Sequence, residues 1–258
     1  MKVKILGAHQ GESDTIRFTS ILVDGRLVID AGGLTGSLSL EDQVAIDAAL
    51  ITHQHHDHVK DLPGFMHNRW HAKGLDLYCM GHTRGVLEAH VFNDVTWPSM
   101  THSTGTRHPL VFHGAHAGQP LTVLDYEVLP IEVSHTVPTQ GYYISDGAAS
   151  LFYTADTRGD GAPPWDGIRP GLLIVETTMS SEYEEIAHRF GHLTPHSLGT
   201  ELRAYHKRQG YFPRIICIHI NPHHEERIRE QIAALSKELD TPIELGYEGM
   251  EIEVGRDE

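Results

Sequence analysis

The sequence Leu50-Ile51-Thr52-His53-Gln54-His55-His56-Asp57-His58 runs from an apolar, strand-like segment directly into four histidines and one aspartate. It has the H-x-H-x-D-H form, and imidazole and carboxylate groups are the ligands that suit zinc, iron and manganese. Because side chains alternate along a strand, His53 and His55 are expected to point to the same side. A tight turn after them can aim Asp57 and His58 at a second metal. The stretch therefore predicts a site for two divalent metal ions.

Length and composition predict one domain that spans residues 1–258. Of the 258 residues, 40% are hydrophobic, which is enough for a two-layered core. The net charge of −15 repels a phosphate backbone. A large nucleic acid is therefore not the expected partner.

Several features bear on the compartment in which the protein works. The first residues do not have the pattern of a signal peptide, and no apolar run in the sequence is long enough to span a bilayer. Cys79 and Cys217 lie in apolar, strand-like runs and are expected to be buried free thiols, as in a reducing compartment. We therefore expect a cytoplasmic protein without a membrane segment.

Further candidate ligands directly follow strand-like runs elsewhere in the chain. A lone histidine or aspartate at the end of a strand is often only a turn residue or a helix cap, but the histidine-rich stretch favours a shared site. Strands and helices in both halves predict two sheets packed together with helices outside, an αββα sandwich of the α/β class. The residues at the strand ends are Asp30, His135, Asp156, Glu176 and His219.

Local patterns also predict individual elements. Thr194-Pro195 is typical of the start of a helix, which we expect to run to about Gln209. Residues 59–71 are predicted as one helix, and residues 243–254 as a hairpin. Residues 93–120 are predicted to be irregular, and because long irregular segments are often functional loops, we predict a lid over the metal site.

The order of these residues resembles that of the metallo-β-lactamase-fold hydrolases, and the resemblance covers nearly the whole chain. Five stretches are more specifically similar to the class II cyclic-nucleotide phosphodiesterases. One departure is His56, at a spacer position that is often leucine in that family. The five stretches are Asp30-Ala31-Gly32-Gly33, Ile51 to His58, Thr96-Trp97-Pro98, Gly191-His192-Leu193-Thr194-Pro195 and Ile218-His219-Ile220-Asn221-Pro222.

The resemblance implies two bound metal ions, with zinc as the first choice and manganese or iron as alternatives, and a bridging hydroxide that attacks phosphorus. It implies catalytic roles for Asp57, Glu176 and His192, in which Glu176 orients His192 and His192 protonates the leaving oxygen or binds the phosphate. Asp30 would orient a ligand histidine. The implied ligands are His53, His55 and His135 for the first metal, Asp57, His58 and His219 for the second, and Asp156 as the bridge.

The implied activity is hydrolysis of 3′,5′-cyclic nucleotides, cyclic AMP or cyclic GMP, to 5′-monophosphates. The expected partner is thus a small phosphodiester, and analogy with relatives of the fold makes a homodimer the expectation. A different small phosphodiester is an open alternative. The nearest rival is a tRNA 3′-processing endonuclease of the tRNase Z type, which often carries a tRNA-gripping arm between the third histidine and the bridging aspartate. Here Asp156 follows His135 by only 21 positions, which disfavours such an arm.

Two other classes of protein fit the sequence less well. Flavin-linked diiron proteins of this fold carry a carboxylate where this chain has His55, and they usually include a flavin-binding domain. A non-catalytic metal-binding module would be expected to have lost ligands, whereas all the expected ligand positions are occupied here. A hydrolase is therefore the prediction.

Overall fold

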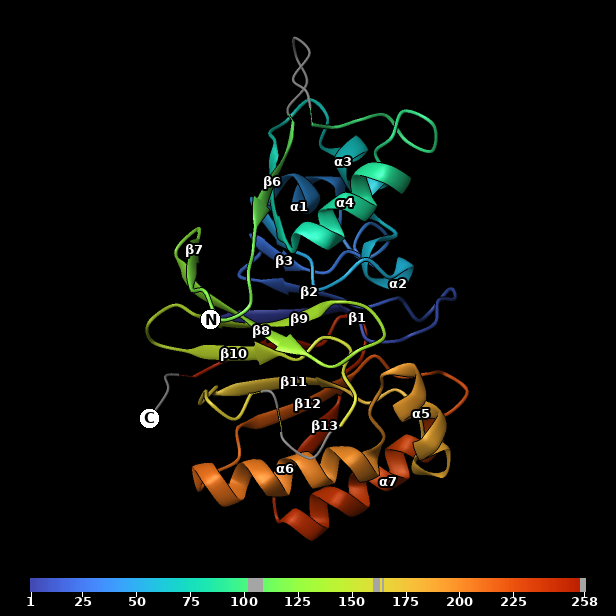
Figure 1. Ribbon diagram of the computed structural model, residues 1–258, viewed down its shortest axis with the longest axis vertical. Helices are drawn as coiled ribbons and strands as arrows, with labels where there is room; N and C mark the ends of the chain where they lie inside the picture. The colour runs from blue at the N-terminus through green and yellow to red at the C-terminus, as the bar shows by residue number, and fades with distance from the viewer. Residues whose placement is uncertain (102–108, 160–162, 164, 256–258) are drawn as a thin grey trace.

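The computed structural model describes residues 1–101, 109–159, 163 and 165–255. Within these residues, two mixed sheets of seven strands each pack face to face, and helices cover the outer face of each sheet (Figure 1). The predicted α/β class and αββα sandwich are confirmed. Apolar side chains from both sheets fill the space between them and form the central core.

The first sheet has the strand order β14-β1-β2-β3-β4-β5-β6. Its strands from β3 to β6 are parallel, while β14, β1, β2 and β3 pair antiparallel. The carboxyl ends of its parallel strands therefore meet at one edge of the molecule. The bounds are β1 Lys2–Gly7, β2 Ser20–Val23, β3 Leu27–Ile29, β4 Ala48–Leu50, β5 Leu75–Cys79, β6 Leu110–Gly114 and β14 Glu251–Glu253.

The second sheet repeats this plan with the order β13-β12-β11-β10-β9-β8-β7. Strands β10 to β13 are parallel, and strands β7 to β10 are antiparallel. The bounds are β7 Leu121–Val123, β8 Tyr126–Val133, β9 Thr139–Ser145, β10 Ser150–Tyr153, β11 Leu172–Glu176, β12 Arg214–Ile218 and β13 Ile243–Leu245.

Helices pack on the outer faces of the two sheets. On the second sheet, Leu198 and Leu202 of α6 and Ile232 of α7 are buried in one apolar cluster, and each such side chain contributes about 1.5–3 kcal/mol. The first-sheet helices are α1 Leu40–Ala45, α2 His56–Val59, α3 Leu62–Asn68 and α4 Gly81–His90. The second-sheet helices are the 3-10 turn η1 Ser181–Tyr183, α5 Glu184–Phe190, α6 Pro195–Gln209 and α7 Glu225–Leu239.

The prediction for α6 is confirmed, and the prediction of one helix over residues 59–71 is wrong. Thr194 caps α6 by accepting a hydrogen bond from the backbone of Ser197. The chain over residues 59–71 instead ends α2 at Val59 and begins α3 at Leu62. Pro63 has no N–H to donate to the carbonyl of Val59, so a continuous helix cannot form there.

The prediction of a hairpin over residues 243–254 is also wrong. Strand β13 pairs with β12 in the second sheet, whereas β14 pairs with β1 in the first sheet. The turn at Glu248-Gly249 thus carries the chain from one sheet to the other. It is held by the carboxylate of Glu248, which accepts hydrogen bonds from the backbone N–H groups of Ala8 and Arg17 at 3.2 and 2.9 Å.

The segment 93–120 is less irregular than predicted, because it contains β6, which pairs with β5. Its described part before residue 102 follows α4 and lies beside α3 and α4 (Figure 1). There the ring of Trp97 lies 6.2 Å from that of His67 on α3. Residues 102–108 lie outside the described residues, and the lid stays a prediction.

Cys79 and Cys217 are buried and free, as predicted, and burial raises the pKa of each thiol to about 12. Among the residues that the structure describes, no helix combines the length and apolar character that crossing a bilayer requires.

Candidate metal centre

The polar residues at the strand ends converge where the carboxyl ends of the parallel strands from both sheets meet. His53 follows β4 of the first sheet, and Asp156 and His219 follow β10 and β12 of the second. His135, which follows the antiparallel strand β8, reaches the same place. The four strand ends therefore bring together residues that are up to 166 positions apart in the sequence.

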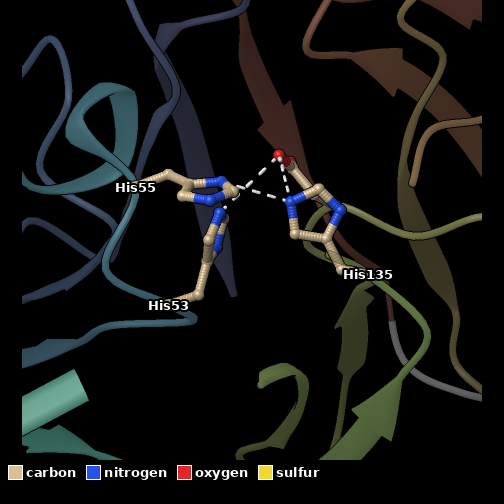
Figure 2. Close-up of side chains that lie close together, drawn as sticks. His53, His55 and His135 are labelled. Carbon is tan, nitrogen blue, oxygen red and sulfur yellow. Dashed lines mark hydrogen bonds and ion pairs between the residues drawn. The ribbon is translucent and has the colours of Figure 1, made fainter. Parts of the chain in front are cut away.

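The first group of candidate ligands consists of three histidines and one aspartate: His53, His55, His135 and Asp156. Their ligand atoms all lie within 4.8 Å of one another. Figure 2 shows the three imidazoles pointing toward one another, with Nε2 of His135 3.2 Å from Nδ1 of His55. Burial lowers the pKa of all three histidines, so they are neutral at pH 7, the form that binds a metal. This group could hold one metal ion.

The second group consists of Asp57, His58, Asp156 and His219, and their ligand atoms also lie within 4.8 Å of one another. Nε2 of His219 lies 3.1 Å from Oδ2 of Asp57, and Nε2 of His58 lies 3.3 Å from Oδ1 of Asp156. Burial alone would lower the pKa of His58, but the carboxylates around it, above all Asp156, outweigh burial and raise that pKa well above its usual value. Asp156 belongs to both groups, as a bridging ligand would.

Three buried polar atoms of these groups make no hydrogen bond of suitable geometry with the described residues: Nε2 of His53, and Nε2 of His58 and Oδ1 of Asp156, which lie 3.3 Å apart. An unsatisfied buried polar atom costs about 1–3 kcal/mol. Nε2 of His53 also lies 3.7 Å from Oδ2 of Asp156, so these atoms lie on the side where the candidate ligands meet, and imidazole nitrogen and carboxylate oxygen are donors that divalent cations prefer. The residues present therefore fit divalent metal ions.

The backbone is strained at three places next to this centre. Asp30, Ala155 and His219 have φ angles of +55°, +57° and +60°, in the left-handed region that residues other than glycine rarely adopt. Each of the three lies just after a strand and turns the chain into the site. Strain of this kind persists only where surrounding contacts hold it, and it is common at functional sites.

Two glycines allow loops to approach each other closely at the centre. A Cβ atom on Gly32 would lie 1.9 Å from the carbonyl oxygen of Asp57, so only glycine fits against the turn that carries this candidate ligand. Gly191 has a φ of +81°, and its carbonyl oxygen accepts a hydrogen bond of 2.9 Å from Nδ1 of His135. The two glycine-containing motifs thus help to position ligand side chains.

Asp30, which directly follows β3, lies behind the histidines rather than among the candidate ligands. Its Oδ2 accepts a hydrogen bond of 2.7 Å from Nδ1 of His58, and its Oδ1 accepts one of 2.9 Å from the backbone of Thr52. The hydroxyl of Thr52 also lies 3.0 Å from Nδ1 of His53. Asp30 therefore orients one histidine directly and a second through Thr52.

Glu176 and His192 form a buried pair beside the second group. Nδ1 of His192 lies 3.0 Å from Oε1 of Glu176, which also accepts a hydrogen bond from the backbone of Thr157. Burial alone would lower the pKa of His192, but its pairing with Glu176 raises that pKa to about 9. Glu176, His192 and His219 form a third cluster whose ligand atoms lie within 4.8 Å.

Two contacts at the centre were not predicted from the sequence. The side-chain amide of Gln10, in the loop after β1, lies 3.4 Å from Nε2 of His192. The hydroxyl of Thr178 lies 2.8 Å from Nδ1 of His219. Glutamine and threonine are common in loops, and no sequence spacing marks these two as part of a site. Only the folded structure, which brings distant loops together, shows their contacts.

Residues 26–220 match the family described as the beta-lactamase superfamily domain. A stretch of 90 residues is 30% identical to 3′,5′-cyclic-nucleotide phosphodiesterase 1 of Saccharomyces cerevisiae, and it covers 34% of this chain and 24% of the yeast protein. A stretch of 170 residues is 26% identical to the probable metallo-hydrolase YhfI of Bacillus subtilis and covers 61% of this chain and 64% of that protein. The matches thus span less than two thirds of either relative.

Solved structures resemble nearly the whole fold. Unliganded yeast PDE1 has a TM-score of 0.76 at 18% identity, covering 98% of this chain and 99% of that one. YhfI from Bacillus subtilis has a TM-score of 0.72 at 19% identity, covering 97% and 98%. The short form of human tRNase Z has a TM-score of 0.68 at 18% identity, covering 98% and 99%. The family match, which covers most of the chain, agrees with this fold: the chain belongs to the beta-lactamase superfamily and has the metallo-β-lactamase fold.

Proposed function

We propose that this protein is a dinuclear metal-dependent phosphodiesterase that hydrolyses 3′,5′-cyclic nucleotides to 5′-monophosphates. The observation that carries the proposal is that two residues each belong to two of the clusters described above. Asp156 belongs to both ligand groups, and His219 belongs both to the second group and to the cluster with Glu176 and His192. Two cation sites thus adjoin a proton-carrying pair, as hydrolysis of a phosphodiester requires.

In this proposal the cations are divalent, with zinc as the first choice and manganese or iron as alternatives. When bound, they polarise the phosphoryl oxygens and lower the pKa of water at the site. The proposed ligands of the first ion are His53, His55 and His135, those of the second are Asp57, His58 and His219, and Asp156, which belongs to both groups, would serve both ions.

The pair of Glu176 and His192 supplies the proton that the leaving group needs. Opening the ring to a 5′-monophosphate breaks the bond between phosphorus and the 3′-oxygen, and a water molecule adds its oxygen to phosphorus. The 3′-oxygen then takes up a proton. Nδ1 of His192 is engaged by Glu176, so Nε2 is the atom that donates this proton. Asp57, whose Oδ2 lies 3.1 Å from Nε2 of His219, would contribute to catalysis by holding the second cation together with that histidine.

Three further observations favour a small phosphodiester over a tRNA. The yeast relative that matches at 30% identity is named a 3′,5′-cyclic-nucleotide phosphodiesterase. The interval between His135 and Asp156 is occupied by β9, β10 and short connections, without an arm that could grip a tRNA. The net charge of −15 also opposes binding of a polyanion. Precursor tRNA nevertheless stays in the test, because human tRNase Z is among the structural neighbours.

The experiment offers four substrates to the same metal-analysed protein: cyclic AMP, cyclic GMP, a 2′,3′-cyclic nucleotide and a precursor tRNA. We expect 5′-monophosphate from one or both 3′,5′-cyclic nucleotides, and no product after treatment with a chelator. Cleavage of the tRNA alone would overturn the proposal in favour of a processing nuclease. Hydrolysis of the 2′,3′-cyclic nucleotide alone would keep the phosphodiesterase chemistry but replace the substrate.

A further inference from the structure

Thr178 lies where three loops of the candidate centre meet. It follows β11 by two residues and is fully buried. Its backbone N–H donates a hydrogen bond of 3.0 Å to the carbonyl of Leu193, next to His192. Its own carbonyl accepts one of 3.0 Å from the backbone of Asn221, two residues after His219. The backbone of this one residue therefore joins β11 to the loops of both histidines.

The hydroxyl of Thr178 connects side chains of the same loops. Its oxygen lies 2.7 Å from Oε2 of Glu176, 2.8 Å from Nδ1 of His219 and 3.4 Å from Nδ1 of His192. A hydroxyl has one hydrogen to donate, and a carboxylate can only accept. The hydroxyl must therefore donate to Glu176 and accept from His219.

This direction of hydrogen bonding determines the tautomer of His219. Nδ1 of His219 carries the hydrogen, and Nε2, which faces Oδ2 of Asp57 at 3.1 Å, has a free lone pair for a cation. We propose that Thr178 is a positioning residue, whose hydroxyl fixes this tautomer of His219 and joins the second ligand group to the pair of Glu176 and His192.

The first sheet contains the same arrangement. The hydroxyl of Thr52 lies 2.9 Å from Oδ2 of Asp30 and 3.0 Å from Nδ1 of His53. Asp30 also accepts directly from His58, as Glu176 accepts from His192. A carboxylate–threonine–histidine chain thus occurs once at the end of each sheet. Its recurrence at strand ends of two separate sheets supports an orienting role for the hydroxyl rather than one of packing alone.

The inference rests on the proposed metal ligands, and its test uses metal alone. Metal-free wild type and Thr178→Val are titrated with Co²⁺, whose absorption reports each bound ion. Valine keeps the shape of threonine and removes the hydroxyl. We expect the affinity for the second equivalent to fall by about 10–100-fold in Thr178→Val, with the first equivalent unchanged. Thr178→Ser restores the hydroxyl and is expected to bind the second equivalent as the wild type does.

A second readout follows the tautomer itself. In zinc-loaded wild type, the ¹⁵N resonances of the His219 imidazole are expected to show a protonated Nδ1.

The matched control for the metal titration is Thr177→Val, because Thr177 is equally buried but its hydroxyl donates to the backbone carbonyl of Glu176 at 2.8 Å. This control is expected to bind both equivalents as tightly as the wild type.

Three results would overturn the inference: unchanged binding of both equivalents by Thr178→Val, equally weak binding by Thr178→Ser and Thr178→Val, or a His219 protonated at Nε2. None of these measurements contains a nucleotide. Failure of wild type to hydrolyse cyclic nucleotides would therefore overturn the proposed function without changing the outcome for Thr178.

Discussion

The Oδ2 atom of Asp30 lies 2.7 Å from Nδ1 of His58, and both side chains are completely buried. The pair places a negative charge behind a proposed ligand and keeps the hydrogen of that imidazole on Nδ1. Nε2 of His58, which has no hydrogen-bond partner among the described residues, is thereby turned toward Asp156 at 3.3 Å. The buried carboxylate thus prepares His58 to bind a cation.

The first prediction concerns this pair. Asp30→Asn keeps the shape of the side chain but removes the charge and leaves a single acceptor oxygen for Thr52 and His58. We expect the affinity for the second metal equivalent to fall by about 10–100-fold, measured by titration of the metal-free protein. The control is Asp76→Asn, which alters a half-exposed aspartate that also lies 2.7 Å from a histidine, His113. Equal affinity in Asp30→Asn and wild type would contradict the role of Asp30.

The second prediction distinguishes two adjacent histidines. His55 faces His135 in the first group, whereas His56 is exposed and its ring lies 6.4 Å from that of Phe18. His55→Ala is expected to lose one metal equivalent while its fold stays intact by circular dichroism. Its activity is expected to fall by more than the roughly 10–100-fold that is typical when a residue that only hydrogen-bonds to a metal ligand is lost. His56→Ala is expected to keep both metals. Full turnover by His55→Ala would refute the proposed ligand set.

The third prediction concerns His192. Because Nδ1 of His192 is held by Glu176, His192→Ala removes the proposed proton donor without removing a proposed ligand. We expect kcat to fall by about 10²–10⁴-fold while two metal equivalents stay bound, as determined by steady-state kinetics and elemental analysis. His196→Ala, at an exposed histidine on α6, is the control. Loss of a metal from His192→Ala would show that this residue is a ligand instead.

The histidine-rich stretch could be recognised from the sequence as a candidate metal site because its proposed ligands lie close together in the chain. Four of the proposed ligands lie within residues 53–58, and the period of a strand is enough to place His53 and His55 on one side. The other proposed ligands could be recognised as candidates because each follows an apolar run that forms a strand. His135, Asp156 and His219 all lie at such ends.

Contacts between distant loops could not be predicted in this way. Gln10 reaches His192 only because the loop after β1 pairs with the loop after β12, through a hydrogen bond from its N–H to the carbonyl of Ile220. Likewise, Glu248-Gly249 has the local pattern of a hairpin turn, yet its flanking strands belong to different sheets. Local patterns predict that the chain turns, but the sheet that each strand joins depends on packing between distant residues.

The fourth prediction concerns stability and pH. Nδ1 of His9 lies 2.7 Å from Oε1 of Glu248. Burial alone would lower the pKa of His9 and raise that of Glu248, but the pairing outweighs burial, so the pKa of His9 is raised and that of Glu248 is lowered. The stabilisation is complete below the unfolded pKa of His9, 6.5, and above that of Glu248, 4.5. It is lost as pH rises through the raised pKa of His9 or falls through the lowered pKa of Glu248.

We therefore expect His9→Gln to lower the free energy of unfolding most at pH 5.5, by about 1.5–3 kcal/mol, and less at pH 9. The measurement is urea unfolding of wild type and variant in the presence of a chelator, so that metal binding does not contribute to the difference. An equal difference at both pH values would mean that the ion pair does not stabilise the fold.

We propose that two cations and one cyclic nucleotide bind together at the cluster around Asp156. The most direct measurement adds Zn²⁺ or Mn²⁺ stepwise to metal-free protein and follows bound metal by elemental analysis together with hydrolysis of cyclic AMP and cyclic GMP. We expect two tightly bound equivalents per chain, and we expect the release of 5′-monophosphate to reach its full rate only after the second equivalent has bound. Binding of a single equivalent, or full turnover of these nucleotides without metal, would contradict it.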